Sequence, residues 1–239
     1  MAKKPLLLLF TGPVGVGKSQ LIKSYEAARS IGPVAPLHMT TVSPSRSIPT
    51  IIPDDEVVWQ IYTNISLGID FTIDTNFTDK TTVELIEHAE TRGYEVQVHF
   101  VGCQLGVQVS RDGYMSQIQM EQLREKSLNR LYELSQLSDD FFIYDNSTGL
   151  RHQALVLRYF RHDNMFVQYD DEELKISDIK AKIHTGYPRG RARMFEELYC
   201  RKDAGMRGAG SEAFTMPGWV IEYFFCPILD LQPDHFGLV

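Results

Sequence analysis

Residues 12–19 read GPVGVGKS and satisfy the pattern G-x-x-x-x-G-K-S/T. Glycines in this pattern let the backbone wrap closely around phosphate oxygens, with amide hydrogens pointing inward at the start of a helix. The lysine then reaches the β- and γ-phosphates of a nucleoside triphosphate, and the hydroxyl holds magnesium. The sequence therefore predicts that ATP or GTP binds with Mg²⁺ on this phosphate loop, through Gly12, Pro13, Val14, Gly15, Val16, Gly17, Lys18 and Ser19.

A second polar group follows residues 68–74, GIDFTID, where apolar side chains alternate as in a strand. Asp74 ends this stretch, and Thr75 and Asn76 come next. Phosphoryl transfer to a hydroxyl needs that hydroxyl close to the γ-phosphate, usually with a carboxylate that accepts its proton. We therefore expect all three residues to bind the acceptor, with Asp74 acting as the base, gripping the acceptor or binding magnesium through water.

Other carboxylates remain candidates for the base. Asp54 and Asp55 follow a proline-rich segment and are the second candidates for the general base after Asp74. Of the two, Asp55 is predicted to be catalytic. Asp145 also ends an apolar stretch, and a turn-capping role is as good an interpretation of it as a catalytic one.

Arginines are expected around the transferring phosphoryl group, where negative charge develops. Arg111 lies at a break between two helical patterns, and Arg124 lies 13 residues further on. We predict that both belong to a helical lid over the triphosphate, spanning about residues 104–138. Arg46, in the segment SPSRSIP, is predicted to bind an acidic group of the acceptor.

The elements that must position these side chains alternate along the chain. Residues 6–10, LLLLF, form a continuous apolar run, as in a strand buried on both faces of a parallel sheet. Strand and helix patterns then repeat to about residue 150, which predicts an α/β fold with a mostly parallel central sheet flanked by helices. Ligands of such sheets bind at the carboxyl ends of the strands, where the phosphate loop, DTN and DNS all fall.

The pattern changes after residue 150. Residues 154–170 are expected to form a hairpin around Asp163 and Asn164, and the apolar residues 219–231 are expected to pack back on the core. We therefore predict a P-loop kinase core over residues 1–150 and a C-terminal α+β extension over residues 151–239.

Bulk properties narrow the class of protein. The 239 residues are 43% hydrophobic and carry a formal charge of −7, so no specific nucleic-acid partner is expected. The apolar run after the N-terminus is too short for a secretion signal, and no stretch approaches a membrane span. Three separated cysteines indicate a reducing compartment. A cytoplasmic location is predicted, with an effector secreted without a cleaved signal as the alternative.

At residues 5–150 the chain resembles the zeta-toxin-like kinases, which phosphorylate a small-molecule hydroxyl. The resemblance lies in GPVGVGKS, FTIDTNFTD, ETRGYEVQVHFVG and REKSLNRL followed by IYDNS, in that order. It implies a P-loop kinase fold and an acceptor-binding role for Asp74 and its neighbours. It also implies that Arg111 and Arg124 stabilise the transferred phosphate. The acceptors implied are nucleotide sugars such as UDP-N-acetylglucosamine, or a dinucleotide, and the partner implied is an inhibitory antitoxin-like protein.

The chain departs from the family at two places. Asp74 stands where the family has glutamate, and the segment HMTTVSPSR lacks the aspartate that serves the family as base. Asp54, Asp55 or Asp74 takes that role, or the acceptor is unusual.

The segment TTVSPSR also resembles guanylate-kinase-type enzymes, in which case Arg46 binds the phosphate of a nucleoside monophosphate.

A different class of function is a nucleotide-dependent module that binds a partner. An arginine-rich segment at residues 186–212 motivates this alternative, through Arg189, Arg191, Arg193, Arg201, Lys202 and Arg207. Acidic residues dilute that charge, which favours an ordinary solvated surface.

Overall fold

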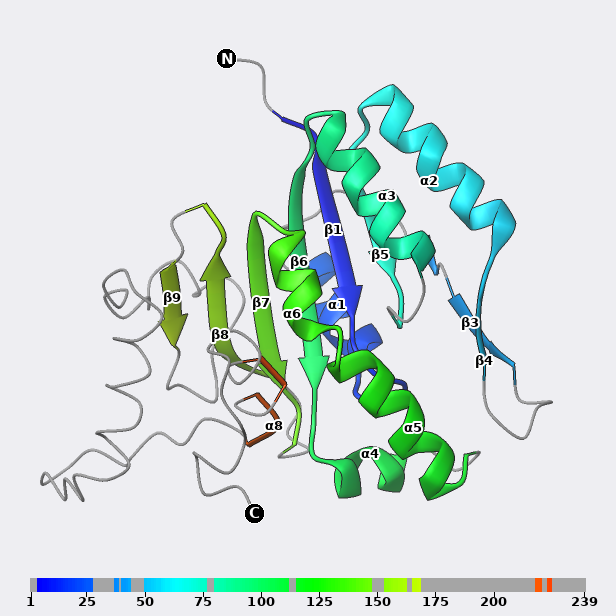
Figure 1. Cartoon of the computed structure of the whole chain (residues 1–239), viewed down its shortest axis with the longest axis vertical. Coiled ribbons are helices and arrows are strands. Elements are labelled where there is room, and N and C mark those ends of the chain that lie inside the picture. The colour runs from blue at the N-terminus through cyan, green and yellow to red at the C-terminus, as the bar shows by residue number, and fades with distance from the viewer. Residues whose placement is uncertain are drawn as a thin grey trace, which may run out of the picture.

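The computed structural model describes residues 4–27, 37–38, 40–43, 50–76, 80–111, 115–147, 153–162, 165–168, 218–220 and 223–224. Within these residues the main sheet has seven strands in the order β2-β5-β1-β6-β7-β8-β9, and the first five are parallel. Its strands are β1 (Leu6–Thr11), β2 (Leu37–His38), β5 (Phe71–Asp74), β6 (Glu95–Gly102), β7 (Asp140–Asp145), β8 (Ala154–Phe160) and β9 (Met165–Gln168). The predicted α/β class with a mostly parallel sheet is confirmed (Figure 1).

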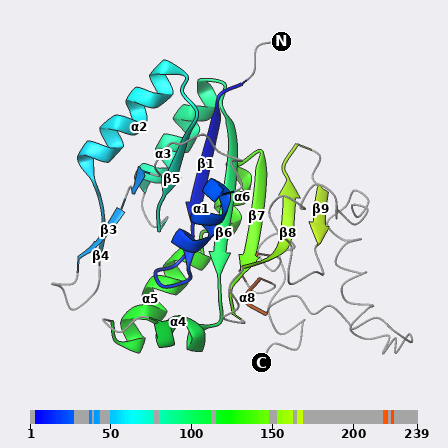
Figure 2. The same ribbon diagram turned by 180° about the vertical axis from the view of Figure 1, so that it is seen from behind.

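Helices cover both faces of this sheet. They are α1 (Lys18–Ala27), α2 (Asp55–Leu67), α3 (Lys80–Thr91), α4 (Leu105–Arg111), α5 (Gln117–Leu128), α6 (Leu131–Gln136) and the short α8 (Gly218–Val220). Helix α1 lies on the face seen in Figure 2, whereas α3 and α6 lie on the face seen in Figure 1. A small antiparallel pair, β3 (Thr40–Ser43) and β4 (Thr50–Pro53), stands apart from the main sheet.

Strand β1 is the middle one of the five parallel strands, and its two faces contact two different hydrophobic cores. Leu7 and Leu9 pack on the side of α2, α3 and α6, whereas Leu8 and Phe10 pack against α1. All four are at most 3% exposed, as expected for a central parallel strand. Because β5 and β6 flank β1 on opposite sides, its carboxyl end is the point at which ligands bind in such sheets.

The boundary between α2 and β5 corrects one expectation. The strand predicted over residues 68–74 begins only at Phe71, because Gly68 instead ends α2 in the left-handed conformation. The Ile69 amide donates to the Asn64 carbonyl at 3.2 Å, and the Ile69 side chain is 44% exposed rather than in the core. Asp70 accepts a hydrogen bond from the Leu6 amide at 2.8 Å, a structural role at the start of the strand.

The segment predicted as a helical lid contains α4, α5 and α6. Ser116 starts α5 with a capping box to Gln119, and residues 112–114 between α4 and α5 lie outside the described residues. Movement of this segment over a nucleotide stays a prediction.

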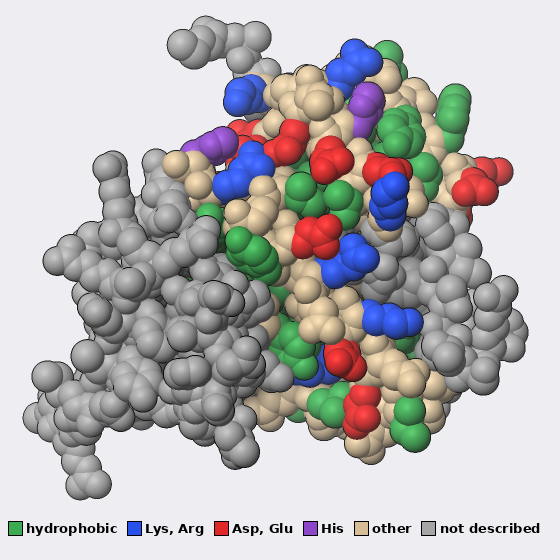
Figure 3. Space-filling model, viewed as in Figure 1, with side chains coloured by type: hydrophobic (Ala, Val, Ile, Leu, Met, Phe, Trp, Pro, Cys, Tyr) green, Lys and Arg blue, Asp and Glu red, His purple; other side chains and the backbone are tan. Residues whose placement is uncertain are grey.

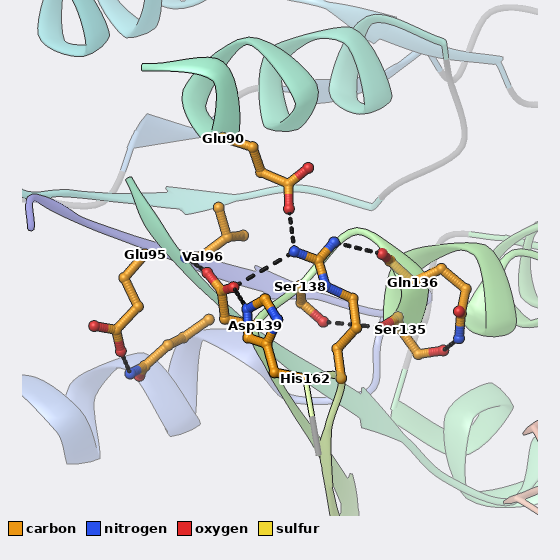
Figure 4. A network of polar contacts seen from close by, with 10 residues as sticks. Glu90, Glu95, Val96, Ser135, Gln136, Ser138, Asp139 and His162 are labelled. Carbon is orange, nitrogen blue, oxygen red and sulfur yellow. Dashed lines mark hydrogen bonds and ion pairs between the residues drawn. The ribbon is translucent and has the colours of Figure 1, made fainter. Parts of the chain in front are cut away.

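A polar cluster fastens the end of the sheet opposite the phosphate loop (Figure 4). Asp139, just before β7, accepts from the Val96 amide at 2.8 Å and from His162 at 2.6 Å. Arg161 donates to the Gln136 carbonyl at 2.7 Å and pairs with Glu90 of α3. These contacts join α3, β6, β7 and β8 at the amino ends of the parallel strands, away from the site described below.

Residues after 150 continue the sheet and enter the core. Strand β8 pairs antiparallel with β7, and β9 pairs antiparallel with β8, as the expected hairpin requires. Val220 and Phe224 belong to the core on the α3 face. The domain boundary at residue 150 stays a prediction, and the arginine-rich segment lies outside the described residues.

The described surface carries charges of both signs. On the face of the molecule seen in Figure 1, Figure 3 shows acidic and basic side chains interspersed with hydrophobic ones over the described residues. In the described part of the chain, no helix has the length and apolar character needed to cross a membrane.

The contact between Gly102 and Trp219 generates a test of this packing. A Cβ at Gly102 would lie 2.5 Å from the indole ring, so Gly102→Ala should lower the free energy of unfolding by about 1–3 kcal/mol. Trp219 is 5% exposed, and Trp219→Ala should cost about 3–5 kcal/mol. The double variant should lose less than the sum of the two, because removing the ring makes room for the added methyl group.

Denaturant unfolding of the four proteins measures this coupling. Gly106→Ala is the matched control: a Cβ there meets nothing within 4 Å, and its position in α4 favours alanine. Strictly additive losses for the Gly102 and Trp219 variants would contradict the packing described.

Candidate active site

The phosphate loop connects β1 to α1 in a conformation that requires glycine. Gly12 and Gly17 have φ of 140° and 95°. A Cβ on Gly12 would lie 2.1 Å from the Val101 carbonyl oxygen, and one on Gly17 would lie 2.5 Å from the Asn146 side-chain nitrogen. The backbone of β6 and the Asn146 side chain therefore lie directly against the loop, and the positive φ at both positions favours glycine.

Lys18 turns its ammonium back over the loop. Its Nζ donates to the carbonyls of Gly12 at 2.9 Å and Pro13 at 3.1 Å, and to Oδ1 of Asn76 at 2.7 Å. Burial lowers the pKa of Lys18 to about 8, while the nearby Asp74 carboxylate acts in the opposite direction. The lysine thus joins the loop to the polar end of β5.

The end of β5 brings the predicted acceptor residues beside the loop. Asp74 is paired in register with Phe10, the residue before Thr11 at the end of β1. The Thr75 amide donates to the Phe10 carbonyl at 3.0 Å, and the Thr75 side chain is buried. Asp74 and Asn76 are half-buried, and the Asn76 side chain accepts a hydrogen bond from Lys18 of the loop.

The two predicted lid arginines bind backbone carbonyls just after β6 and β7. Arg111 donates to the Asn146 carbonyl at 3.0 Å, and Arg124 donates to the Cys103 carbonyl at 3.4 Å. Burial raises the pKa of the Cys103 thiol to about 11, and both guanidiniums act against that rise. Asp145 accepts from Ser147 at 2.6 Å and from the Trp219 indole at 3.1 Å, which gives it a structural role.

Ser19 lies on the first turn of α1 with its side chain exposed. A magnesium ion bound with a nucleotide usually takes only one or two protein oxygens, together with phosphates and water. The exposed hydroxyl next to Lys18 fits that arrangement, with Asp74 as a further oxygen near the loop. In the described residues, no three His, Cys, Asp or Glu side chains cluster as a separate metal site.

Helix α1, which carries Lys18 and Ser19, is anchored by a buried polar group. The Tyr25 hydroxyl lies 2.9 Å from that of Tyr144 and 3.2 Å from Nδ1 of His99. His99 is stacked between Phe10 and Phe142, with centroid distances of 4.9 and 4.5 Å. Burial, with Arg158 as the second cause, lowers its pKa to about 3, so the imidazole stays neutral.

The remaining predicted site residues lie elsewhere or outside the described chain. The Asp54 carboxylate caps α2 by accepting from the amides of Glu56 and Val57. Asp55 is exposed on the first turn of the same helix, which packs against α3 and β2, and its catalytic role stays a prediction. Arg46 lies outside the described residues.

Three further residues contact the loop: Asn146 lies in the segment DNS predicted at this edge of the sheet, whereas Gln108 and Gln153 were not predicted as site residues. Gln108, Asn146 and Gln153 each donate a side-chain amide hydrogen to a loop carbonyl. Asn146 and Gln153 lie 130 and 136 positions from their partners, so no local pattern identifies the hydrogen bonds themselves.

Comparison with known proteins gives structural neighbours only. No family model matches the sequence, and no curated protein matches it. One solved structure, from the PezAT chromosomal toxin–antitoxin system of Streptococcus pneumoniae, matches with 12% identity and a TM-score of 0.46. The match covers 84% of this chain and 86% of the other. The complex AvrRxo1-ORF1:-ORF2 with ATP matches with 12% identity and a TM-score of 0.42, over 75% of this chain and 63% of the other. At these values the similarity by itself assigns no activity to the chain.

The lowered pKa of Lys18 can be measured directly. Lysine labelled with ¹³C at Cε should show Lys18 titrating near pH 8, and Asp74→Asn should lower that pKa further because a stabilising negative charge is lost. Lys18→Arg identifies the resonance. A Lys18 that titrates near its ordinary 10.5 would contradict the burial described.

The same shift predicts how stability depends on pH. The unfolded chain keeps the Lys18 proton to about 10.5, whereas the native protein releases it near 8, so the unfolded state binds more protons between these values. The contribution of Lys18 to the free energy of unfolding should therefore rise with pH in this interval. Lys18→Met should remove that rise in pH-dependent denaturant unfolding.

Proposed function

We propose that this chain is a magnesium-dependent, zeta-toxin-like P-loop kinase. It transfers the γ-phosphate of ATP or GTP to a hydroxyl of a small molecule. The acceptor is a nucleotide sugar resembling UDP-N-acetylglucosamine, or a dinucleotide. The observation that carries this proposal is the position of Lys18, whose ammonium joins the phosphate loop to Asn76 and lies near Asp74.

This arrangement suits phosphoryl transfer because the Lys18 ammonium contacts both the loop proposed to bind the triphosphate and the residues proposed to bind the acceptor. Lys18 moves from the loop carbonyls to the β- and γ-phosphate oxygens when the triphosphate enters the loop. Asp74 and Asn76, from the end of the adjacent strand, then face the γ-phosphate, with Thr75 fixing their backbone through Phe10. A hydroxyl held by these side chains lies next to the phosphoryl group.

The transfer step is a single displacement. The acceptor hydroxyl gives its proton to the Asp74 carboxylate, and its oxygen forms a bond to the γ-phosphorus. The bond from that phosphorus to the bridging oxygen breaks, and the nucleoside diphosphate leaves with the electron pair. Magnesium bound at Ser19 would neutralise charge on the phosphates.

Arg111 and Arg124 supply the remaining positive charge. Their guanidiniums bind the Asn146 and Cys103 carbonyls, just after β7 and β6. Both strands end at the same edge of the sheet as β1, which leads into the loop. In the proposed reaction they turn toward the transferring group, where positive side chains stabilise the transition state.

Labelled γ-phosphate offered with a panel of acceptors tests the proposal. The label should appear on a hydroxyl of a nucleotide sugar or dinucleotide, and Lys18→Ala should abolish transfer. Asp74→Asn should lower kcat by roughly 10²-fold, the usual loss for a general base. Asp70→Asn is the matched control, because this carboxylate binds the Leu6 amide at the opposite end of β5.

Each contrary result has a specific meaning. Full transfer by Lys18→Ala would refute the mechanism. An unchanged rate for Asp74→Asn would return the base role to Asp54 or Asp55. Label on the phosphate of a mononucleotide would favour the guanylate-kinase-like alternative and Arg46.

A further inference from the structure

Three carboxamide side chains hold the outer side of the phosphate loop. Nε2 of Gln108 donates to the Val14 carbonyl at 2.6 Å, and Nδ2 of Asn146 donates to the Val16 carbonyl at 2.8 Å. Nε2 of Gln153 donates to the Gly17 carbonyl at 3.0 Å. The three donors come from α4, from the end of β7 and from the residue before β8, so separate parts of the chain converge on one loop.

The planar trans peptide makes these contacts relevant to the inner side of the loop. In each peptide unit the carbonyl of one residue and the amide hydrogen of the next point in opposite directions. A carbonyl held outward at Val14, Val16 or Gly17 therefore turns the amide of Gly15, Gly17 or Lys18 inward. Inward amides are what bind phosphate oxygens in such a loop.

We propose that Gln108, Asn146 and Gln153 are positioning residues that set the orientation of the loop amides before a triphosphate binds. This inference rests on the proposed function for its ligand, but not for its effect on the loop itself. The three side chains act through the loop backbone.

The surroundings of Gln108 indicate that its amide nitrogen, rather than its amide oxygen, holds the loop. The residue is fully buried, and its Oε1 has no hydrogen-bond partner among the described residues. An unpaired buried acceptor is unfavourable, so the fold keeps a glutamine here at a cost that an apolar residue of the same length would avoid. Its Nε2 contacts Val14 and the Met120 sulfur.

Asn146 connects the loop to Arg111 of the proposed lid. Its backbone amide donates to the Gly102 carbonyl at 2.8 Å, which fixes it at the end of the sheet. Its backbone carbonyl accepts from Arg111, and its side chain reaches the loop at the place where Gly17 has no Cβ. Helix α4 therefore reaches the loop in two ways, directly through Gln108 and indirectly through Arg111 and Asn146.

The three contacts differ in how replaceable they are. The Gly17 carbonyl also accepts from the Gln20 amide at 3.0 Å within the first turn of α1. Loss of Gln153 leaves that helical bond in place, whereas loss of Gln108 removes the donor that holds Val14. Gln108 should therefore matter more than Gln153.

Hydrogen exchange of the nucleotide-free protein and ATP affinity together test the proposal. Gln108→Met should speed exchange of the amides in residues 12–18 and weaken ATP binding, each by roughly 10-fold, as for one lost hydrogen bond. Gln153→Met should change both less. Gln97→Met is the matched control, because its carboxamide binds Glu95 rather than the loop. Affinity for AMP, which lacks the outer phosphates, should change little in any variant.

The readouts separate positioning from stability and from the proposed function. Variants that lower the melting temperature but leave loop exchange and ATP affinity unchanged would overturn the positioning role. If the wild-type protein binds no ATP, the proposed function fails, and faster loop exchange in Gln108→Met still supports the positioning role. Equal exchange in Gln108→Met and Gln97→Met would overturn it whether or not ATP binds.

Discussion

A loop that points its amide hydrogens at a phosphate must point its carbonyl oxygens into the protein, and those oxygens need donors there. The described structure meets this constraint at Val14, Val16 and Gly17, whose carbonyls accept from the carboxamides of Gln108, Asn146 and Gln153. The surrounding architecture follows from it. Gln108 of α4, Asn146 after β7 and Gln153 before β8 are placed where their side chains reach the loop.

The same constraint explains the state of Lys18. An ammonium removed from water loses stabilisation, which lowers its pKa, and the Asp74 carboxylate recovers part of that loss. The loop carbonyls and Asn76 accept the hydrogen bonds of this ammonium. A single cation therefore links the loop to the strand end that we propose holds the acceptor.

Much of this arrangement could be predicted from the sequence because its signals are local. The apolar run before the loop, the glycine spacing and the polar end of β5 each lie within a few residues and identify the sheet edge where the site forms. The predicted start of β5 at residue 68 is wrong, because Gly68 caps the C-terminus of α2. The alternation of Ile69, Phe71 and Ile73 does not reveal where the helix ends and the strand begins. The sequence places Asn146 at this edge through the segment DNS but does not reveal its bond to the loop, and it does not single out Gln108 or Gln153, because their partners are distant in sequence and neutral amides carry no motif. Arg46 lies outside the described residues, so its predicted role is unchanged.

Calorimetric titration of the wild-type protein with ATP in the presence of Mg²⁺ tests the central claim most directly, that residues 12–19 bind a triphosphate. We expect one binding event per chain, displaced by inorganic tripolyphosphate but not by adenosine, because the proposed loop recognises phosphate oxygens. Absence of binding, or displacement by adenosine alone, would contradict it.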